Sequence, residues 1–460
     1  MPSTEPFAET PTADLLAQAM NAHRVGQVPE AREAYMAVLH REPQNADCLH
    51  MLGALEGQFG SDEVAAYLIG KAIEISPQEA MFHNNLGNVL LNLKRPEEAE
   101  AAYRHAVALE PGRYDAINNL AVLVGRRGDR DGAEKLFKEL LEVAPGFTDA
   151  RENLASLYLR NGRLNDALTQ CAIGLVTSPR AKGLRRLLGL AYSTWDMPEQ
   201  AAAVYRDWIK DEPDDPQPAH YLAAITGVDV PARATDAFVK ATFDGFADSF
   251  DTTLAELEYR APTFMGEALD EALGAPTKTL RVADAGCGTG LCAQHVGPWA
   301  KTLSGVDLSV PMLKLAAARQ VYDELIHGEL VAYLRERPAA FDVLISADTL
   351  CYFGDLQEFA HAARASLCGN GWLVFTVESH ADEAGAKDFS LQGHGRYSHR
   401  AGYLQQVLRE AGFEEPVLRQ VILRKEATKP VQGWLVRAQV SAAWNHPTHD
   451  KSALRTSTHG

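Results

Sequence analysis

The residues best able to do chemistry lie in one stretch, Asp284 to Gly290, which has three glycines at alternate positions. An apolar run enters this stretch, so we expect a buried strand at about 280–285 that turns sharply into a helix. A second apolar run ends in Asp307. A glycine turn lets the backbone approach a nucleotide-like ligand, and a carboxylate at the next strand end can bind both ribose hydroxyls. The pattern predicts a nucleoside site, and a tight turn without a ligand is the alternative.

This stretch resembles the S-adenosylmethionine-binding loop of class I methyltransferases, which matches Asp284-x-Gly286-x-Gly288-x-Gly290 with Asp307 as the ribose acid. The dinucleotide fingerprint G-x-G-x-x-G would need a glycine where Leu291 stands, so the sequence favours the methyl donor over NAD. The resemblance implies that Asp284 anchors the loop and the methionine end of the donor. The donor-binding set that it implies is Phe250, Asp284, Gly286, Cys287, Gly288, Gly290, Asp307, Leu308, Met312, Glu329, Leu330 and Asp348.

Two members of this set have a structural alternative of equal weight. In the methyltransferase fold the segment after the second strand reads adenine, which points to Glu329 with Leu330; Glu329 could instead be a solvated acid at a helix start. The motif Phe243-Asp244-Gly245-Phe246-Ala247-Asp248-Ser249-Phe250-Asp251 resembles the lead-in that covers the donor in many methyltransferases. Its phenylalanines also fall at helical spacing, so a plain amphipathic helix over 234–250 is the alternative.

The chain before this domain repeats with a period of 34 residues. Three series keep this step: Pro43, Pro77, Pro111, Pro145, Pro179 and Pro213; Ala31, Ala65, Ala99, Ala133, Ala167 and Ala201; and the small residues Ala19, Gly53, Gly87, Ala121, Ala155 and Gly189. The small residue lets two helices pack closely, and the proline ends the second helix. Such hairpins must stack to bury their apolar faces. The pattern resembles six tetratricopeptide repeats, followed by a capping helix around 219–223.

Asparagines recur at this period at Asn85, Asn119 and Asn153. A side-chain amide both donates and accepts, so it can bind a peptide backbone of any sequence. The series resembles, over three rungs, the asparagine ladder in the repeats of O-linked N-acetylglucosamine transferase. We therefore expect a protein or peptide partner on the concave face. Hydrogen bonding of each asparagine within its own repeat is the alternative.

Composition limits the partners and the compartment. The formal net charge is −17 and no basic run occurs, which argues against nucleic acid as a partner. The six cysteines form no C-x-x-C pair and no zinc pattern, so we expect no metal and a reduced, cytoplasmic protein. We expect no signal peptide and no membrane span.

We expect an all-α repeat solenoid at 12–226, a linker at 227–233 and an α/β Rossmann-like methyltransferase domain at 234–443, with disordered ends at 1–11 and 444–460. The sheet should be mostly parallel with an antiparallel carboxyl-terminal strand. Strands are expected near 280–285, 302–307, 341–347, 371–378, 417–424 and 432–440, and helices near 291–299, 310–320, 355–368 and 400–411. Gly369-Asn370-Gly371-Trp372 should be the turn before the fifth strand.

Candidate acceptor-side residues follow the fourth and fifth strands, because ligands of open parallel sheets lie at the carboxyl ends of strands. Asp348 should act in catalysis and Tyr352 should bind substrate, although Asp348 could be a helix N-cap. A loop with His394, Tyr397 and His399 could form a lid and supply a base. An ordinary surface loop is the alternative.

The lead-in, the glycine loop and the stretches 341–356 and 395–397 together resemble bacterial methyltransferases that carry tetratricopeptide repeats. The N/D-P-P-Y motif is absent after the fourth strand, where Ala347-Asp348-Thr349-Leu350 stands, and no paired-glutamate arginine-methylation loop is evident. The resemblance implies methyl transfer to an O or N acceptor, with the repeats recruiting a protein or peptide. Two alternatives stay open: a scaffold with a non-catalytic donor-binding domain, and a small-molecule methyltransferase that uses its repeats only for assembly. The sequence leaves the oligomeric state open.

Overall fold

The computed structural model describes residues 10–381, 386–426 and 429–441. The chain divides into two compact units, Met1–Leu187 and Leu188–Gly460, each described below by itself. The expected tail 444–460 and residues 1–9 of the expected disordered start lie outside the described residues. Among the helices in the described ranges, none has the length and apolar character needed to cross a bilayer.

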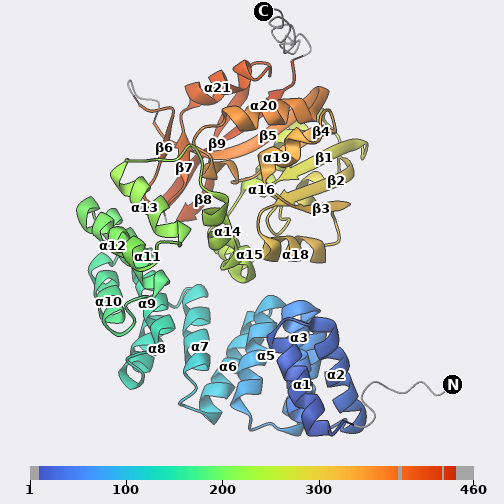
Figure 1. Ribbon diagram of the computed structural model, residues 1–460, viewed down its shortest axis with the longest axis vertical. Coiled ribbons are helices and arrows are strands. Elements are labelled where there is room, and N and C mark those ends of the chain that lie inside the picture. The colour runs from blue at the N-terminus through green and yellow to red at the C-terminus, as the bar shows by residue number, and fades with distance from the viewer. Residues whose placement is uncertain (1–9, 382–385, 427–428, 442–460) are drawn as a thin grey trace, which may run out of the picture. The chain divides into compact units, whose positions relative to one another are not determined.

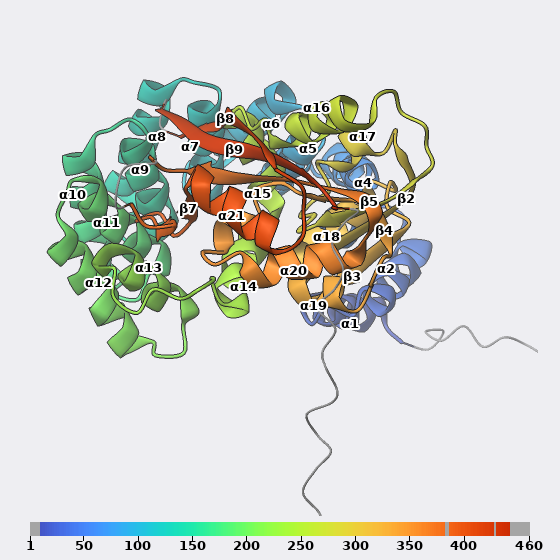
Figure 2. The same cartoon turned by 90° about the horizontal axis from the view of Figure 1, so that it is seen from above.

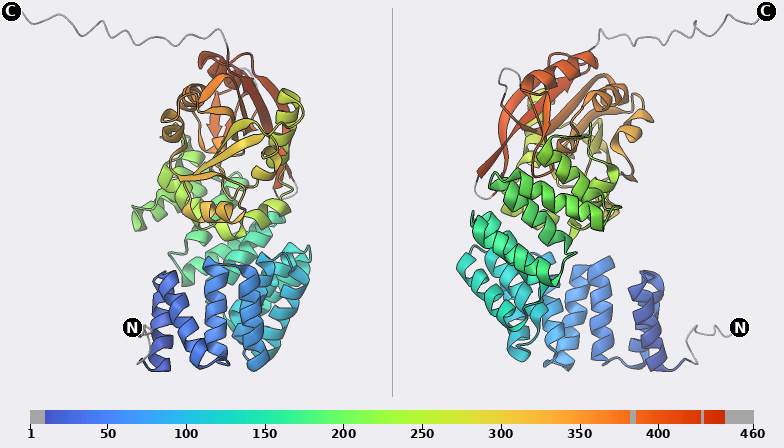
Figure 3. Two further views of the ribbon diagram at one scale, coloured as in Figure 1. Left: turned by 90° about the vertical axis from the view of Figure 1, so that its right-hand side faces the viewer. Right: turned by 60° about the vertical axis from the view of Figure 1, so that its left-hand side comes forward.

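The repeats form helical hairpins, as the 34-residue period predicts. Their first helices are α1 (Thr12–Arg24), α3 (Ala46–Phe59), α5 (Ala80–Asn92), α7 (Tyr114–Arg126), α9 (Thr148–Arg160) and α11 (Lys182–Thr194). Their second helices are α2 (Val28–Arg41), α4 (Asp62–Ile75), α6 (Pro96–Leu109), α8 (Arg130–Val143), α10 (Leu164–Thr177) and α12 (Pro198–Asp211). The expected capping helix is α13 (Pro216–Thr226), which ends at Gly227 in the left-handed conformation. Helices α1 to α6 stand side by side in Figure 3.

Close packing within each hairpin explains the small-residue series. A β-carbon added to Gly87 would lie 2.5 Å from the ring of Tyr103, and one added to Gly189 would lie 2.3 Å from the ring of Tyr205. The periodic alanines of the second helices, such as Ala99 and Ala133, are fully buried. These positions therefore admit only small side chains, because the facing helix occupies the space.

The second unit contains a nine-stranded sheet in the order β3-β2-β1-β4-β5-β7-β6, with β9 paired to β5 and β8 paired to β9 (Figure 1). Its strands are β1 (Leu280–Ala285), β2 (Ala300–Asp307), β3 (Glu324–His327), β4 (Phe341–Ser346), β5 (Leu367–Ser379), β6 (Phe389–Leu391), β7 (Tyr397–His399), β8 (Val417–Glu426) and β9 (Lys429–Gln439). Pairs among β1 to β5 are parallel, and β9 runs antiparallel to β5. The predicted mostly parallel sheet with an antiparallel carboxyl-terminal strand is confirmed.

Helices cover both faces of this sheet (Figure 2). One core joins the sheet to α19 (Leu330–Arg335), α20 (Gln357–Ser366) and α21 (Ala401–Glu410). The opposite core joins it to α16 (Ala261–Leu273) and the short helix α17 (Ala293–Val296). The remaining helices are α14 (Asp236–Asp244), α15 (Ala247–Glu256) and α18 (Val310–Ala318), with a single 3₁₀ turn at Leu350–Tyr352.

Two local expectations are wrong. The expected helix 234–250 is split at Gly245 into α14 and α15, which places Phe243 on the first helix and Phe250 on the second. The expected turn at Gly369–Trp372 lies inside β5, where the pairing with β4 shifts between Phe341 and Val343. A glycine-rich segment marks a strand irregularity as readily as a turn, so the two are hard to distinguish from sequence.

Candidate active site

The glycine loop follows β1 directly and adopts backbone conformations that favour glycine. Gly286, Gly288 and Gly290 have φ values of 78°, 52° and 85°. A β-carbon on Gly286 would lie 2.1 Å from Oγ1 of Thr349, whereas one on Gly288 would meet only Phe250, at 3.9 Å. Gly286 and Gly288 line a cavity of about 260 Å³. The loop therefore brings bare backbone to the cavity wall, which suits close approach of a ligand.

Asp307 ends β2 and lies beside this loop. Its Oδ2 accepts a hydrogen bond from the Gly288 amide at 2.9 Å, and its Oδ1 accepts one from the Ser309 amide at 2.8 Å. Burial raises the pKa of Asp307, while these amides oppose the shift. The carboxylate is thus oriented by backbone donors and still lines the cavity. Each of its oxygens keeps a lone pair that could accept a hydroxyl.

Asp284 is the last residue but one of β1 and lies behind the loop. Oδ2 accepts a hydrogen bond from the Tyr322 hydroxyl at 2.7 Å. Oδ1 is buried and has no hydrogen-bond partner among the described residues. Burial raises the pKa of Asp284 to about 7. A buried carboxylate oxygen without a partner is costly, and a bound donor group would relieve that cost.

Three residues of the expected donor set do not line the cavity: Asp284, Cys287 and Gly290. The Cys287 side chain packs beneath the loop, where a β-carbon on Gly305 would lie 2.9 Å from its sulfur. The other nine members of the set line the cavity. Glu329 lies at the helix start, as its structural alternative expects, and it also lines the cavity. Its Oε2 caps α19 by accepting from the Ala332 amide at 2.8 Å, while its Oε1 is buried without a hydrogen-bond partner in the described chain.

The lead-in segment forms an aromatic wall. Phe243 of α14, Phe246 just before α15 and Phe250 of α15 line the cavity. The rings of Phe246 and Phe250 meet edge to face with centroids 5.5 Å apart. Two side-chain contacts fasten this segment to the end of the cavity where Asp307 lies. Ser309 donates to Asp244 at 2.7 Å, and Thr289 of the glycine loop donates to Asp251 at 2.5 Å.

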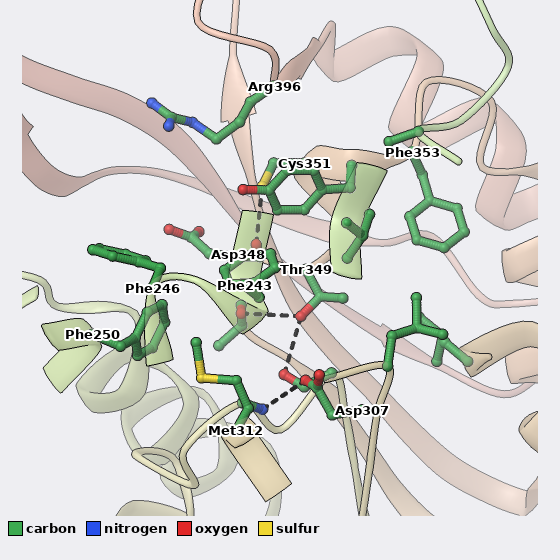
Figure 4. A pocket seen from close by; sticks show the side chains of 18 of the residues that line it. Phe243, Phe246, Phe250, Asp307, Met312, Asp348, Thr349, Cys351, Phe353 and Arg396 are labelled. Atoms are coloured by element: carbon green, nitrogen blue, oxygen red, sulfur yellow. Dashed lines mark hydrogen bonds between the residues drawn. The ribbon is translucent and has the colours of Figure 1, made fainter. Parts of the chain in front are cut away.

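The cavity has two chemically different ends. Figure 4 shows Asp307 and Met312 at one end, Arg396 at the other, and Asp348 and Thr349 between them. The far end also includes Tyr259, Tyr352, Arg424 and Glu426. The expected substrate residue Tyr352 therefore does line the cavity.

Asp348 follows β4 and has a left-handed backbone with a φ of 52°. Its Oδ1 accepts from the Thr376 hydroxyl at 2.9 Å, and its Oδ2 accepts from Arg424 at 2.7 Å. Burial raises the pKa of Asp348, although Arg424 opposes the shift. A helix N-cap role is excluded, because its side chain bonds to Thr376 and Arg424 instead. Each oxygen thus has one protein donor, and the bond to Arg424 holds the carboxylate in an ion-pair cluster.

That cluster, which we call the arginine cluster, comprises Asp348, Glu378, Arg396, Arg424 and Glu426. Arg424 is bonded to all three acids, and Arg396 donates to Glu378 at 2.5 Å and to Glu426 at 2.7 Å. Burial opposes ionisation of Glu378, but the two arginines lower its pKa to about 2. The cluster is therefore charged at neutral pH, and each of its acids is paired with at least one arginine.

The three expected lid residues lie outside the cavity lining. Tyr397 is fully buried and donates to the carbonyl oxygen of Pro231 at 2.7 Å. His399 is fully buried, its Nε2 lies 3.1 Å from the carbonyl oxygen of Gly354, and burial lowers its pKa to about 4. His394 lies 3.4 Å from Glu378, and burial lowers its pKa to about 4 as well. These side chains pack the loop rather than face the cavity.

The linker is bonded to the segment that follows β4, and α13 is bonded to the loop that carries Arg396. The Ala232 carbonyl oxygen accepts hydrogen bonds from the amides of Gly354 and Asp355, both at 2.8 Å. Nε2 of His220, on α13, lies 2.9 Å from the Gly395 carbonyl oxygen. The capping helix thus packs against the residue next to Arg396.

The periodic asparagines bond between repeats, which neither sequence alternative foresaw. Nδ2 of Asn119 donates to Oδ1 of Asn84 at 3.1 Å, and Nδ2 of Asn153 donates to Oδ1 of Asn118 at 3.0 Å. Nδ2 of Asn85 lies 2.8 Å from Nε2 of His50. The asparagines are half-buried, so part of each side chain remains available.

Sequence reasoning missed four residues of the far end: Tyr259, Arg396, Arg424 and Glu426. They come from three separate segments, and no spacing connects them. One signal was present, because Arg396 stands in the loop that was singled out for its histidines and tyrosine.

Comparison with known proteins agrees with this geometry. Residues 257–417 match the family model of a methyltransferase domain, and residues 80–113 and 126–176 match tetratricopeptide repeat models. The chain is 38% identical over 84 residues to methyltransferase-like protein 27 of Homo sapiens, a match to 18% of this chain and 34% of that protein. It is 30% identical over 109 residues to the ubiquinone biosynthesis O-methyltransferase of Thiobacillus denitrificans, a match to 22% of this chain and 46% of that protein. Less than half of either relative is spanned.

The solved structures that resemble the chain include an S-adenosylmethionine-dependent methyltransferase from Mesorhizobium loti. It is 21% identical, has a TM-score of 0.30, and is matched over 38% of this chain and 96% of its own. A tetratricopeptide-repeat protein of Thermus thermophilus is 22% identical and has a TM-score of 0.35. The match covers 39% of this chain and 98% of that protein.

Proposed function

We propose, from the premise that the chain combines tetratricopeptide repeats with a class I methyltransferase domain, that it transfers a methyl group from S-adenosylmethionine to an O or N acceptor. The observation that carries this proposal is the juxtaposition of Asp307 with the backbone of Gly286 and Gly288 at one cavity end. A carboxylate at a strand end beside a bare glycine turn suits a nucleoside with two free ribose hydroxyls.

The residues at that end fit the donor. Asp307 would hold the ribose, Gly286 and Gly288 would pass beneath the nucleoside, and Glu329 with Leu330 would face the adenine. The unpartnered Oδ1 of Asp284 supports a role at the cationic methionine end, where an ammonium group or a bridging water would satisfy it. When bound, the donor supplies a methyl group already activated by its sulfonium centre.

The acceptor end has little capacity for proton transfer. Asp348 is tied to Thr376 and Arg424, and the histidines His394 and His399 do not line the cavity. Methyl transfer requires alignment and exclusion of water more than acid–base help. An acceptor that arrives unprotonated therefore suits this end, and the aromatic wall of Phe243 and Phe246 would exclude water from it.

The occupied carboxylate of Asp348 also supports the rival function, a scaffold that binds the donor without turning it over. Transfer of radiolabelled methyl groups to proteins and to small-molecule extracts separates the two. Turnover abolished by Asp307→Ala supports the enzyme. Donor binding with no transfer to either fraction supports the scaffold.

The repeats are proposed to recruit a protein or peptide partner through Asn85, Asn119 and Asn153. The test is capture of partners by the full chain and by a triple alanine variant of these residues. Because the asparagines also bond between repeats, thermal unfolding must be measured in parallel. Loss of capture with an intact array supports the proposal, and unchanged capture rejects the asparagines as the contact.

A further inference from the structure

The far end of the cavity contains hydrogen-bonding groups that the donor end does not use. Arg396 lines the cavity and donates through Nε to Glu378 and through Nη2 to Glu426. Its Nη1 meets no hydrogen-bond acceptor within the described residues. One face of a fixed guanidinium is therefore open to a ligand.

Two phenol groups accompany this guanidinium. Tyr352 and Tyr259 line the same cavity, and neither hydroxyl has a hydrogen-bond partner in the described ranges. Tyr352 and Arg396 interact electrostatically, as Tyr259 does with Arg424. The free groups at this end are thus a cationic N–H, two hydroxyls and Oε2 of Glu426, because both arginines donate to Oε1 of that acid.

Each neighbouring acid is paired with at least one arginine. Asp348 accepts with both oxygens, and Glu378 accepts from Arg396 and Arg424 and faces His394. Three acids against two arginines leave the arginine cluster one negative charge in excess, so the cluster does not attract anions by net charge. Selection must come instead from the free donors, which match an oxygen acceptor group.

The walls around these donors are apolar. Phe243 and Phe246 form one side, and Leu254 and Leu257 contribute aliphatic surface. Such a site binds a largely apolar body and orients it by a few polar groups. A charged acceptor group without an apolar body would leave these walls uncovered.

We infer that the acceptor is a small organic acid with an aromatic or aliphatic body, whose carboxylate is bound by Nη1 of Arg396. This inference rests on the proposed function, since it assigns the donor to the Asp307 end. Arg396 is the specificity-determining residue for the acid. The contact is one charge-assisted hydrogen bond, because the other two guanidinium nitrogens are committed.

The loop that carries Arg396 is held in place before a ligand arrives. His220 contacts Gly395, and a β-carbon on Gly395 would lie 2.9 Å from the ring of Tyr221. Tyr397 is fixed to Pro231 on the other side of Arg396. Such preorganisation lowers the entropic cost of binding.

The test is calorimetric titration of the full chain, saturated with S-adenosylhomocysteine, with phenylacetate and with its uncharged analogue phenylacetamide. A short series of aliphatic monocarboxylates and their amides varies the apolar body of the ligand. The wild type should bind at least one acid in the millimolar range or tighter, and more tightly than its amide. Arg396→Gln should lower the affinity for that acid by about tenfold to a hundredfold and leave the affinity for the amide unchanged. Arg396→Lys should recover part of the preference.

Arg419→Gln is the matched control, because Arg419 is an exposed arginine of β8 that pairs with Glu267 and Glu271 outside the cavity. Equal binding of acid and amide, no saturable binding by any acid, or a preference that survives Arg396→Gln would each overturn the inference. Titration with S-adenosylhomocysteine alone reports on the proposed function, so the two failures are distinguishable. The same acids titrated without it show whether their site is independent of the donor.

Discussion

Nε2 of His220 lies 2.9 Å from the carbonyl oxygen of Gly395, which connects the capping helix to the residue beside Arg396. The imidazole is buried, and its ring also packs against Phe238 with centroids 3.9 Å apart. Since α13 continues the repeat pattern, a repeat element helps to hold the loop that carries Arg396. The capping helix is therefore part of the α/β unit's architecture, in agreement with the division of the chain at Leu187.

His220→Leu should loosen the loop without affecting the donor end. The variant leaves the Gly395 carbonyl without its side-chain partner, so amide hydrogen exchange should become faster in residues 392–396. The affinity for S-adenosylhomocysteine should stay within about twofold of wild type, because Asp307 is unchanged. His361→Leu, at an exposed position on α20, is the control. Unchanged exchange in the loop would mean that His220 does not position it.

Asp284 should make the α/β unit less stable as the pH rises. Its folded pKa is raised from 3.8 to about 7, so the folded state holds a proton that the unfolded state releases between these values. Stability from this group is therefore highest below pH 4, falls through the window from pH 4 to 7, and stays low above it. The decline is at most about 4 kcal/mol, since one pKa unit corresponds to about 1.4 kcal/mol.

Asp284→Asn removes the titration while keeping the shape. The thermal midpoint of the variant should fall less than that of wild type between pH 5 and pH 8. Asp270→Asn, at an exposed position on α16, controls for a simple change in net charge. Equal pH dependence in wild type and Asp284→Asn would contradict the raised pKa.

The lead-in should act as a latch over the donor. Asp251 accepts from Thr289 of the glycine loop and is paired with Arg319, so opening the segment breaks a charged contact. Asp251→Asn should speed dissociation of S-adenosylhomocysteine by about tenfold, as measured by stopped-flow fluorescence. Thr252→Ala, on the exposed side of the same helix, should leave the rate unchanged. A wild-type dissociation rate in Asp251→Asn would show that the contact does not limit release.

Asn118 should matter for the stability of the repeats whatever they bind. Asn118→Ala leaves Nδ2 of Asn153 without its acceptor, at a cost of about 1 kcal/mol in the free energy of unfolding. Urea denaturation followed by circular dichroism measures this cost. Asn165→Ala, on the second helix of a repeat, is a control away from these bonds. No loss of stability in Asn118→Ala would leave the inter-repeat bonds without an energetic role.

The sequence predicts the parts of the molecule that local rules determine. The 34-residue period predicts the helical hairpins, and the spacing from Gly290 to Asp307 predicts the glycine loop with its following acid. Both can be predicted because each rule acts within one short segment. The arginine cluster escaped prediction because Asp348, Glu378, Arg396 and Glu426 meet only after four segments fold together. His399 and Tyr397 were expected in catalysis because titratable residues in a loop resemble a site. Tyr397 is buried against Pro231 of the linker and His399 against Gly354, and spacing does not encode this tertiary packing.

The central claim is that Asp307 and the glycine loop bind S-adenosylmethionine. Calorimetric titration of the full chain with S-adenosylmethionine and S-adenosylhomocysteine, beside Asp307→Ala and the exposed control Asp270→Asn, tests it directly. We predict saturable binding with one site per chain in wild type and control, and loss of at least about tenfold in affinity in Asp307→Ala. Absence of binding in the wild type, or unchanged affinity in Asp307→Ala, would contradict the account.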